Sequence, residues 1–83
     1  MYNGKYLRLY EYLKKKEKEL SQYTLTFNEM EHILQFNLPV SAYKYSAWWA
    51  NEIDGMHTQA RSWMLAGWKT SDVIVGKKIT FKK

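Results

Sequence analysis

Polar side chains that can bind a partner gather in one stretch of this chain, from Leu38 to Trp68, together with all four tryptophans. They are Tyr43, Lys44, Tyr45, Asn51, His57, Gln59 and Arg61. Arginine can pair bidentately with guanine in the major groove of DNA, and glutamine with adenine. The residue types therefore predict a surface that binds nucleic acid. We expect the tryptophans to form the core beneath it, about three of the four being mainly buried.

Base edges are the expected targets of Arg61 and Gln59. Tyr43, Lys44 and Tyr45 are expected to contact the nucleic acid beside them. Each of these residues could also be an ordinary solvated side chain with no partner. Their clustering favours a binding role.

Backbone contacts are the second predicted role. Lys69, Lys77 and Lys78 are expected to hold phosphates, which position a protein on DNA without reading its sequence. Asn51 and His57 are expected either to fix their loop and helix start or to contact the backbone.

Catalysis finds little support in the residue types. The chain has no cysteine, and neither His32 nor His57 has the serine and acid of a nucleophilic triad around it. Two histidines without cysteine are not a common zinc ligand set, and phosphate-binding glycine patterns are absent. We therefore expect a protein that is not an enzyme and that has no catalytic residues, metal or cofactor.

The totals agree with one basic domain spanning residues 1–83. The net charge is +5, and residues 55–83 hold six basic side chains and one acidic. A basic balance favours polyanions, although lysines also keep a small aromatic-rich protein soluble. No apolar run is long enough for a membrane span or a signal peptide. These features predict a cytoplasmic protein with no membrane partner.

The first half of the chain reads as helix, strand, helix. Apolar residues at helical spacing predict a helix over Lys5–Leu20. Tyr23–Phe27 is β-prone and runs into a second helix that is expected to end near Phe36-Asn37. Thr26 and Glu29 have the spacing of a capping box at the start of that helix.

The second half is more ambiguous before the C-terminal hairpin. Ser41 can cap a helix over Ala42–Trp49, although strand-like alternation fits the same residues. A loop over Asn51–Gly55 precedes a helix from His57 or Thr58 to Ala66, which Gly67 can terminate. Strands over Lys69–Val75 and Lys78–Phe81 can join through a two-residue turn, Gly76-Lys77.

This order of elements predicts an α+β, winged-helix-like fold with three to four helices, one short strand and a C-terminal β-hairpin. A two-stranded hairpin alone is marginal, and Thr24–Phe27 can supply a third strand. The recognition helix stays open between Ser41–Trp49, which the helix-turn-helix order favours, and His57–Ala66, which the side-chain chemistry favours.

The sequence also resembles a family of short bacterial and phage domains of unknown function. The resemblance rests on Leu25–Leu34, Leu38–Ala42, Trp48–Asn51, His57–Trp63 and Ala66–Trp68, with a final Ile-Thr-Phe at 79–81. Met30 and Ile79 stand where the family pattern has isoleucine and valine. The resemblance implies that Asn51, His57 and Gln59 belong to the family motif, and it implies no activity.

We expect a non-catalytic module that binds nucleic acid, double-stranded DNA in the first place. The main alternative is a protein-interaction module, for example an inhibitor of a host protein, because interfaces are rich in aromatic residues and arginine. The two differ in salt dependence, which is steep for phosphate contacts.

Overall fold

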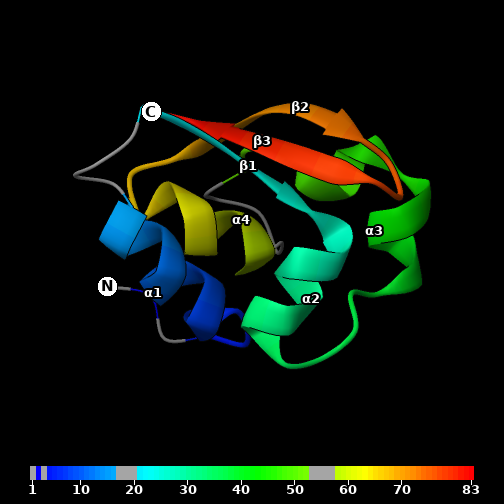
Figure 1. The fold of residues 1–83 in the computed structure, drawn as a ribbon, viewed down its shortest axis with the longest axis horizontal. Coiled ribbons are helices and arrows are strands. Elements are labelled where there is room, and N and C mark those ends of the chain that lie inside the picture. Colours follow the sequence, from blue (N-terminus) through cyan, green and yellow to red (C-terminus); the bar gives the residue numbers. More distant parts are fainter. Residues whose placement is uncertain (1, 3, 17–20, 53–57) are drawn as a thin grey trace.

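The protein is described by a computed structural model that covers residues 2, 4–16, 21–52 and 58–83. Its elements in chain order are α1 (Leu7–Lys16), β1 (Gln22–Thr26), α2 (Phe27–Leu34), α3 (Val40–Lys44), the 3-10 helix η1 (Ser46–Trp49), α4 (Thr58–Met64), β2 (Lys69–Ile74) and β3 (Lys78–Lys82). The expected α+β class with a C-terminal hairpin is confirmed (Figure 1). Of the predicted first helix, residues 17–20 lie outside the described part of the chain.

The three strands form one antiparallel sheet in the order β1-β3-β2. The early strand joins the hairpin as a third strand, as predicted. It pairs with β3 at the centre, with Leu25 opposite Ile79 and Tyr23 opposite Phe81. A β-bulge between Thr70 and Asp72 interrupts the pairing of β2 with β3. Ile79 and Phe81 are completely buried, so one face of the sheet packs on the core.

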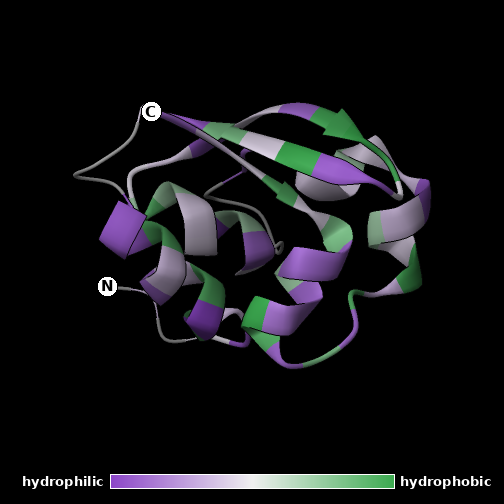
Figure 2. Ribbon diagram, in the orientation of Figure 1, coloured by the Kyte–Doolittle hydropathy of each residue, from purple (hydrophilic) through white to green (hydrophobic). Residues whose placement is uncertain are grey.

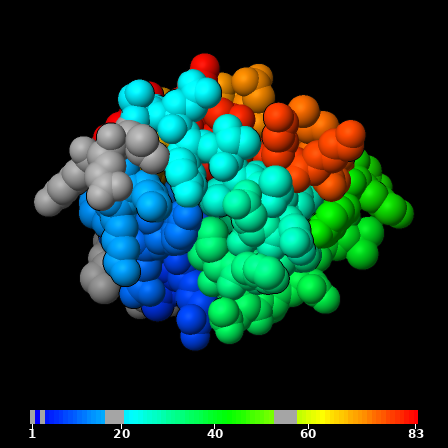
Figure 3. Space-filling model, in the orientation of Figure 1, coloured from blue at the N-terminus to red at the C-terminus, as the bar shows by residue number. Residues whose placement is uncertain are grey.

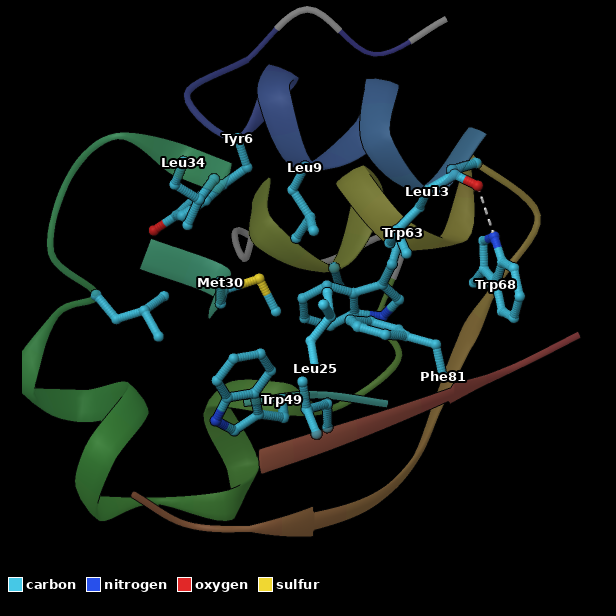
Figure 4. Packing of buried hydrophobic residues seen from close by; sticks show 14 of the residues in the cluster. Tyr6, Leu9, Leu13, Leu25, Met30, Leu34, Trp49, Trp63, Trp68 and Phe81 are labelled. Atoms are coloured by element: carbon cyan, nitrogen blue, oxygen red, sulfur yellow. Dashed lines mark hydrogen bonds between the residues drawn. The ribbon is translucent and has the colours of Figure 1, made fainter. Parts of the chain in front are cut away.

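The core is built around tryptophan rings (Figure 4). Trp63 is completely buried and stacks on Trp49, with ring centroids 5.9 Å apart. Trp68 is also buried, and its Nε1 donates to the carbonyl oxygen of Leu13 on α1 at 2.9 Å. Trp48 is only half-buried. The expectation that three of the four indoles lie mainly in the core is therefore confirmed.

Helix α2 begins where the sequence predicts. Thr26 is the N-cap: its Oγ1 accepts from the Glu29 backbone N–H at 3.0 Å, and Glu29 Oε1 accepts from the Thr26 N–H at 2.8 Å. The Thr26 N–H, and then the Thr26 hydroxyl, stabilise the Glu29 carboxylate and hold its pKa below the ordinary value. The helix ends at Leu34, earlier than expected, because Gln35 adopts the left-handed conformation with φ 68°.

The predicted helix over Ala42–Trp49 is wrong in its start and its continuity. Helix α3 begins at Val40, its N-cap is Pro39, and no side chain caps it. Tyr45 is extended, with φ −124° and ψ 122°, and it separates α3 from η1. The break lets the chain fold back, so that Trp49 Nε1 donates to the carbonyl oxygen of Ala42 at 3.0 Å. The alternative reading as a strand is also wrong.

Glycines shape the two remaining turns. Gly67, with φ 95°, follows α4 as the predicted terminating residue. The hairpin turn holds three residues, Val75–Lys77, where the sequence suggested two. Lys77 N–H donates to the carbonyl oxygen of Ile74 at 2.8 Å, and Gly76 has φ 84°, so 74–77 form a turn whose third residue needs a positive φ.

In the parts of the chain that the structure describes, every helix is too short or too polar to cross a membrane.

Candidate nucleic-acid interface

The hairpin turn and α3 meet at the first residue of α2. The Phe27 N–H donates to the carbonyl oxygen of Lys77 at 2.8 Å. On its other side, the Phe27 ring meets the Tyr43 ring edge to face, with centroids 5.2 Å apart. One buried phenylalanine therefore fixes the position of the lysine-bearing turn relative to α3, and both lie at the right of the view in Figure 1.

The segment from α3 through η1 is the most open helical part of the described chain. Val40 is 66% exposed and Tyr45 is 61% exposed, and Lys44 is also exposed. Only Ala42 and Trp49 are buried. Most side chains of this segment are not used for packing against the core, so they are available to a partner.

Glu31 holds α3 against α2. Its Oε2 accepts from the Leu38 backbone N–H at 2.7 Å and from the Tyr43 hydroxyl at 2.9 Å. Partial burial, and then the bond to Glu31, raise the pKa of Tyr43 above its ordinary value. Tyr43 is therefore positioned as a neutral hydroxyl that donates to Glu31, while 38% of the residue stays exposed.

Asn51 joins η1, α4 and β2 through one side chain. Its Oδ1 accepts from Trp63 Nε1 and from the Thr70 backbone N–H, both at 2.9 Å. Its Nδ2 donates to the carbonyl oxygen of Thr70 at 3.0 Å. These contacts use the amide for internal bracing, so Asn51 serves the fold here and does not present a free amide to a base.

Helix α4 turns much of its polar chemistry inward. Gln59 is 5% exposed, and its Nε2 donates to the carbonyl oxygen of Trp48 at 3.1 Å. The expectation that Gln59 reads a base edge is therefore corrected: the buried amide supports the chain before the 51–52 loop. Arg61 is exposed on the other side of α4. His57 lies outside the described residues.

The predicted phosphate-binding lysines do not form a single cluster. Lys77 in the turn and Lys78 at the start of β3 are both exposed, and the Lys77 carbonyl is joined to α3 through Phe27. Lys69 is exposed at the start of β2, where it pairs with Lys82 at the opposite end of the hairpin. The structure thus links the Lys77 turn to Tyr43 through Phe27, whereas Lys69 lies at the opposite end of the hairpin.

A model of the family described as Domain of unknown function (DUF7662) matches residues 6–83. The chain belongs to this family. Searches of curated proteins and of solved structures find no significant match. The DUF7662 match covers every element described above, so the packing of α3 and the hairpin turn falls within the family's domain.

Sequence reasoning missed the residues that position this DUF7662 surface. Glu31 belongs to no motif, and nothing local to the sequence connects it with Tyr43, twelve residues away. Thr70 was read as an ordinary strand residue, although its hydroxyl donates to the carbonyl oxygen of Trp49 at 2.7 Å. Both bonds depend on long-range folding, which leaves no periodic signal.

A shallow groove of about 380 Å³ runs along the same α3–η1 segment. It is lined by Ser41, Tyr45, Ala47, Trp48, Ala50 and Glu52. The exposed Tyr45 ring and the half-buried Trp48 form its apolar part. Glu52 is the one charged residue in this lining.

Proposed function

We propose that the chain is a winged-helix-like domain that binds double-stranded DNA in the cytoplasm without catalysis. The support for the fold is topological: helix, strand, helix, helical segments, then a hairpin, with the early strand added to β3 in the order β1-β3-β2. In domains built this way, a helix enters the major groove while the hairpin contacts the adjacent backbone. The hairpin turn is accordingly the proposed wing.

The observation that carries the proposal is the double contact of Phe27. The backbone N–H of Phe27 bonds to the carbonyl oxygen of Lys77 in the wing, and the Phe27 ring packs against Tyr43 on α3. Lys44 follows Tyr43 at the end of α3, and Lys78 follows Lys77. Helix and wing thus present cations and an aromatic edge together, as simultaneous groove and phosphate contacts require.

Helix α3 is a better groove-facing element than α4. It follows α2 after a short turn, as a recognition helix does, and Ser41 and Lys44 are exposed polar residues on it. Helix α4 packs against α1 and β2 and buries Gln59. Arg61 is the one exposed cation of α4, and we propose that it makes a secondary contact with the DNA.

The acidic side of α2 limits this surface. Glu29 and Glu31 lie near the same corner, but both are used structurally, Glu29 in the capping box and Glu31 in bonds to Leu38 and Tyr43. A phosphate backbone is therefore expected over the wing and α3, away from the outer face of α2.

A salt series with a labelled duplex tests the proposal. The variant Lys77→Gln/Lys78→Gln is compared with Lys14→Gln/Lys15→Gln, which removes the same charge from exposed positions of α1. If both wing lysines contact phosphate, the slope of log K against log [salt] falls by about 1.8 in the first variant and hardly changes in the second. Wild-type protein that fails to bind duplex at low salt would refute the function.

The groove beside Tyr45 favours one second candidate, a protein-interaction module. Aromatic side chains are enriched at such interfaces, and Tyr45 and Trp48 both line this groove. An interface of this type depends weakly on salt. Binding to a protein partner that survives high salt and is lost in Tyr45→Ala would favour this candidate.

A further inference from the structure

The outer face of the sheet is open and basic. Because Ile79 and Phe81 point into the core, the alternate residues of β3 and their partners point outward. The register arranges them in three rows across the strands: Gln22-Lys82-Lys69, Thr24-Thr80-Asp72 and Thr26-Lys78-Ile74. Hydrophilic residues mark both ends of β3 in Figure 2, and atoms of β1 and the hairpin lie uncovered along the top of Figure 3.

The row at the end away from the wing contains two like charges. Lys69 and Lys82 are directly opposite on neighbouring strands, and Gln22, on the other side of Lys82, is neutral. Such a pair destabilises a sheet, since opposing side chains on one face lie about 5 Å apart. Asp72 is the one carboxylate among the outward-facing residues of these strands, and it sits in the middle row, diagonal to Lys82 and Lys78.

Lys78 extends the positive charge along the strand. It is four residues from Lys82, or roughly 13 Å at the rise of a β-strand. Between them, the Thr80 hydroxyl is 3.0 Å from that of Thr24. The face therefore has lysines at both ends and Thr24, the buried Thr80 and Asp72 in the middle row. Ile74, opposite Lys78, is its one large apolar side chain and is 48% exposed.

We propose that this outer face is a second DNA-contacting surface, which holds the phosphate backbone of a duplex through Lys69 and Lys82. The inference rests on the proposed function and extends it from the wing across the sheet. The repulsion between the two lysines destabilises the free protein. A bound polyanion neutralises this repulsion, so binding stabilises the fold.

A duplex suits this face better than a single strand. Proteins that bind single strands without sequence preference stack the bases on aromatic side chains. All residues of the three strands are described, and the three rows contain no aromatic side chain. What remains is contact with phosphates, which a duplex presents along its outside.

The test combines affinity and stability in one pair of variants. Lys69→Gln/Lys82→Gln removes the opposed charges, and Lys14→Gln/Lys15→Gln is the matched control at exposed positions of the last turns of α1. The sheet variant should lower the salt slope for duplex by about 1.8. It should also raise the melting temperature of the free protein by about 2–5 °C, because the repulsion is gone. The control should do neither.

Three results would overturn the inference. The first is a salt slope for the sheet variant equal to that of the control. The second is a preference of the wild type for single strand over duplex that the sheet variant abolishes. The third is a lower melting temperature of the sheet variant, which would mean that the lysines stabilise the free sheet. Lys77→Gln/Lys78→Gln runs in parallel: if it loses duplex affinity while the sheet variant does not, the proposed function stands and only this extension fails. If the wild type binds no duplex at low salt, both fail.

Discussion

Asn51 shows how a residue that looks like a ligand-binding group can be used up by the fold. Its amide satisfies the indole N–H of Trp63 and both backbone groups of Thr70. An Asn side chain has one acceptor oxygen and one NH₂ group, and both are engaged here. The side chain thus ties the 51–52 loop to the sheet and satisfies a donor on a completely buried tryptophan.

Replacing Asn51 with alanine should therefore destabilise the protein by about 2 kcal/mol, since the Trp63 N–H loses its acceptor in a poorly hydrated site. Thermal unfolding followed by circular dichroism should show a fall in melting temperature of roughly 10 °C. Asn37→Ala, in an exposed loop position, is the control. Equal melting temperatures for the two variants would show that the bracing bonds contribute nothing.

At the scale of elements, local signals predicted what local interactions determine. Helix α2 was predicted from Thr26 and Glu29 because a capping box acts within four residues. Helix α3 was misplaced because its limits depend on Pro39, which starts it, and on Trp49, which folds back onto it. The latter contact has no signature in the hydrophobic period of the sequence.

The candidate site divides in the same way. Lys77 and Lys78 were predicted from composition and are exposed, because hairpin turns are usually solvated. Gln59 was misread because its motif position says nothing about which side of α4 faces the core. That choice is fixed by Ala60 and Trp63 packing inward, and it carries the Gln59 amide under the carbonyl of Trp48.

The choice between α3 and α4 as the DNA-facing element makes a direct prediction. Lys44→Gln and Arg61→Gln each remove one exposed charge. If α3 enters the groove, Lys44→Gln should weaken duplex binding several-fold at low salt and Arg61→Gln should weaken it less. Fluorescence anisotropy on several duplexes measures both. A larger loss for Arg61→Gln, with relaxed sequence preference, would instead assign the groove to α4.

At the scale of the whole molecule, two side-chain hydrogen bonds join α1 to distant elements. Trp68 Nε1 bonds to Leu13, and the hydroxyls of Tyr12 and Tyr23 are 2.7 Å apart, which joins α1 to β1. Desolvation, and then the bond to Tyr23, raise the pKa of Tyr12 from its ordinary 10.0 to about 12. Its neutral form is therefore favoured in the folded state.

This shift predicts how stability responds to alkali. Because the folded pKa of Tyr12 lies above the unfolded one, its contribution is complete below about pH 10 and is lost as the pH rises through about 12. Urea unfolding should show a difference between wild type and Tyr12→Phe that is constant to pH 10 and then shrinks. Tyr45→Phe, at an exposed hydroxyl, is the control. A difference that grew above pH 10 would contradict the predicted sign.

The tryptophans have an optical consequence as well as a structural one. The rings of Trp48 and Trp49 are 4.6 Å apart and cross at 71°. Electronic transitions of two indoles at such a separation mix, so the far-ultraviolet circular dichroism should contain an exciton couplet in addition to the helix bands. Because Trp48 borders the groove on η1, an occupant there would alter the couplet. The couplet from Trp48 and Trp49 can therefore report binding at this groove without an added label.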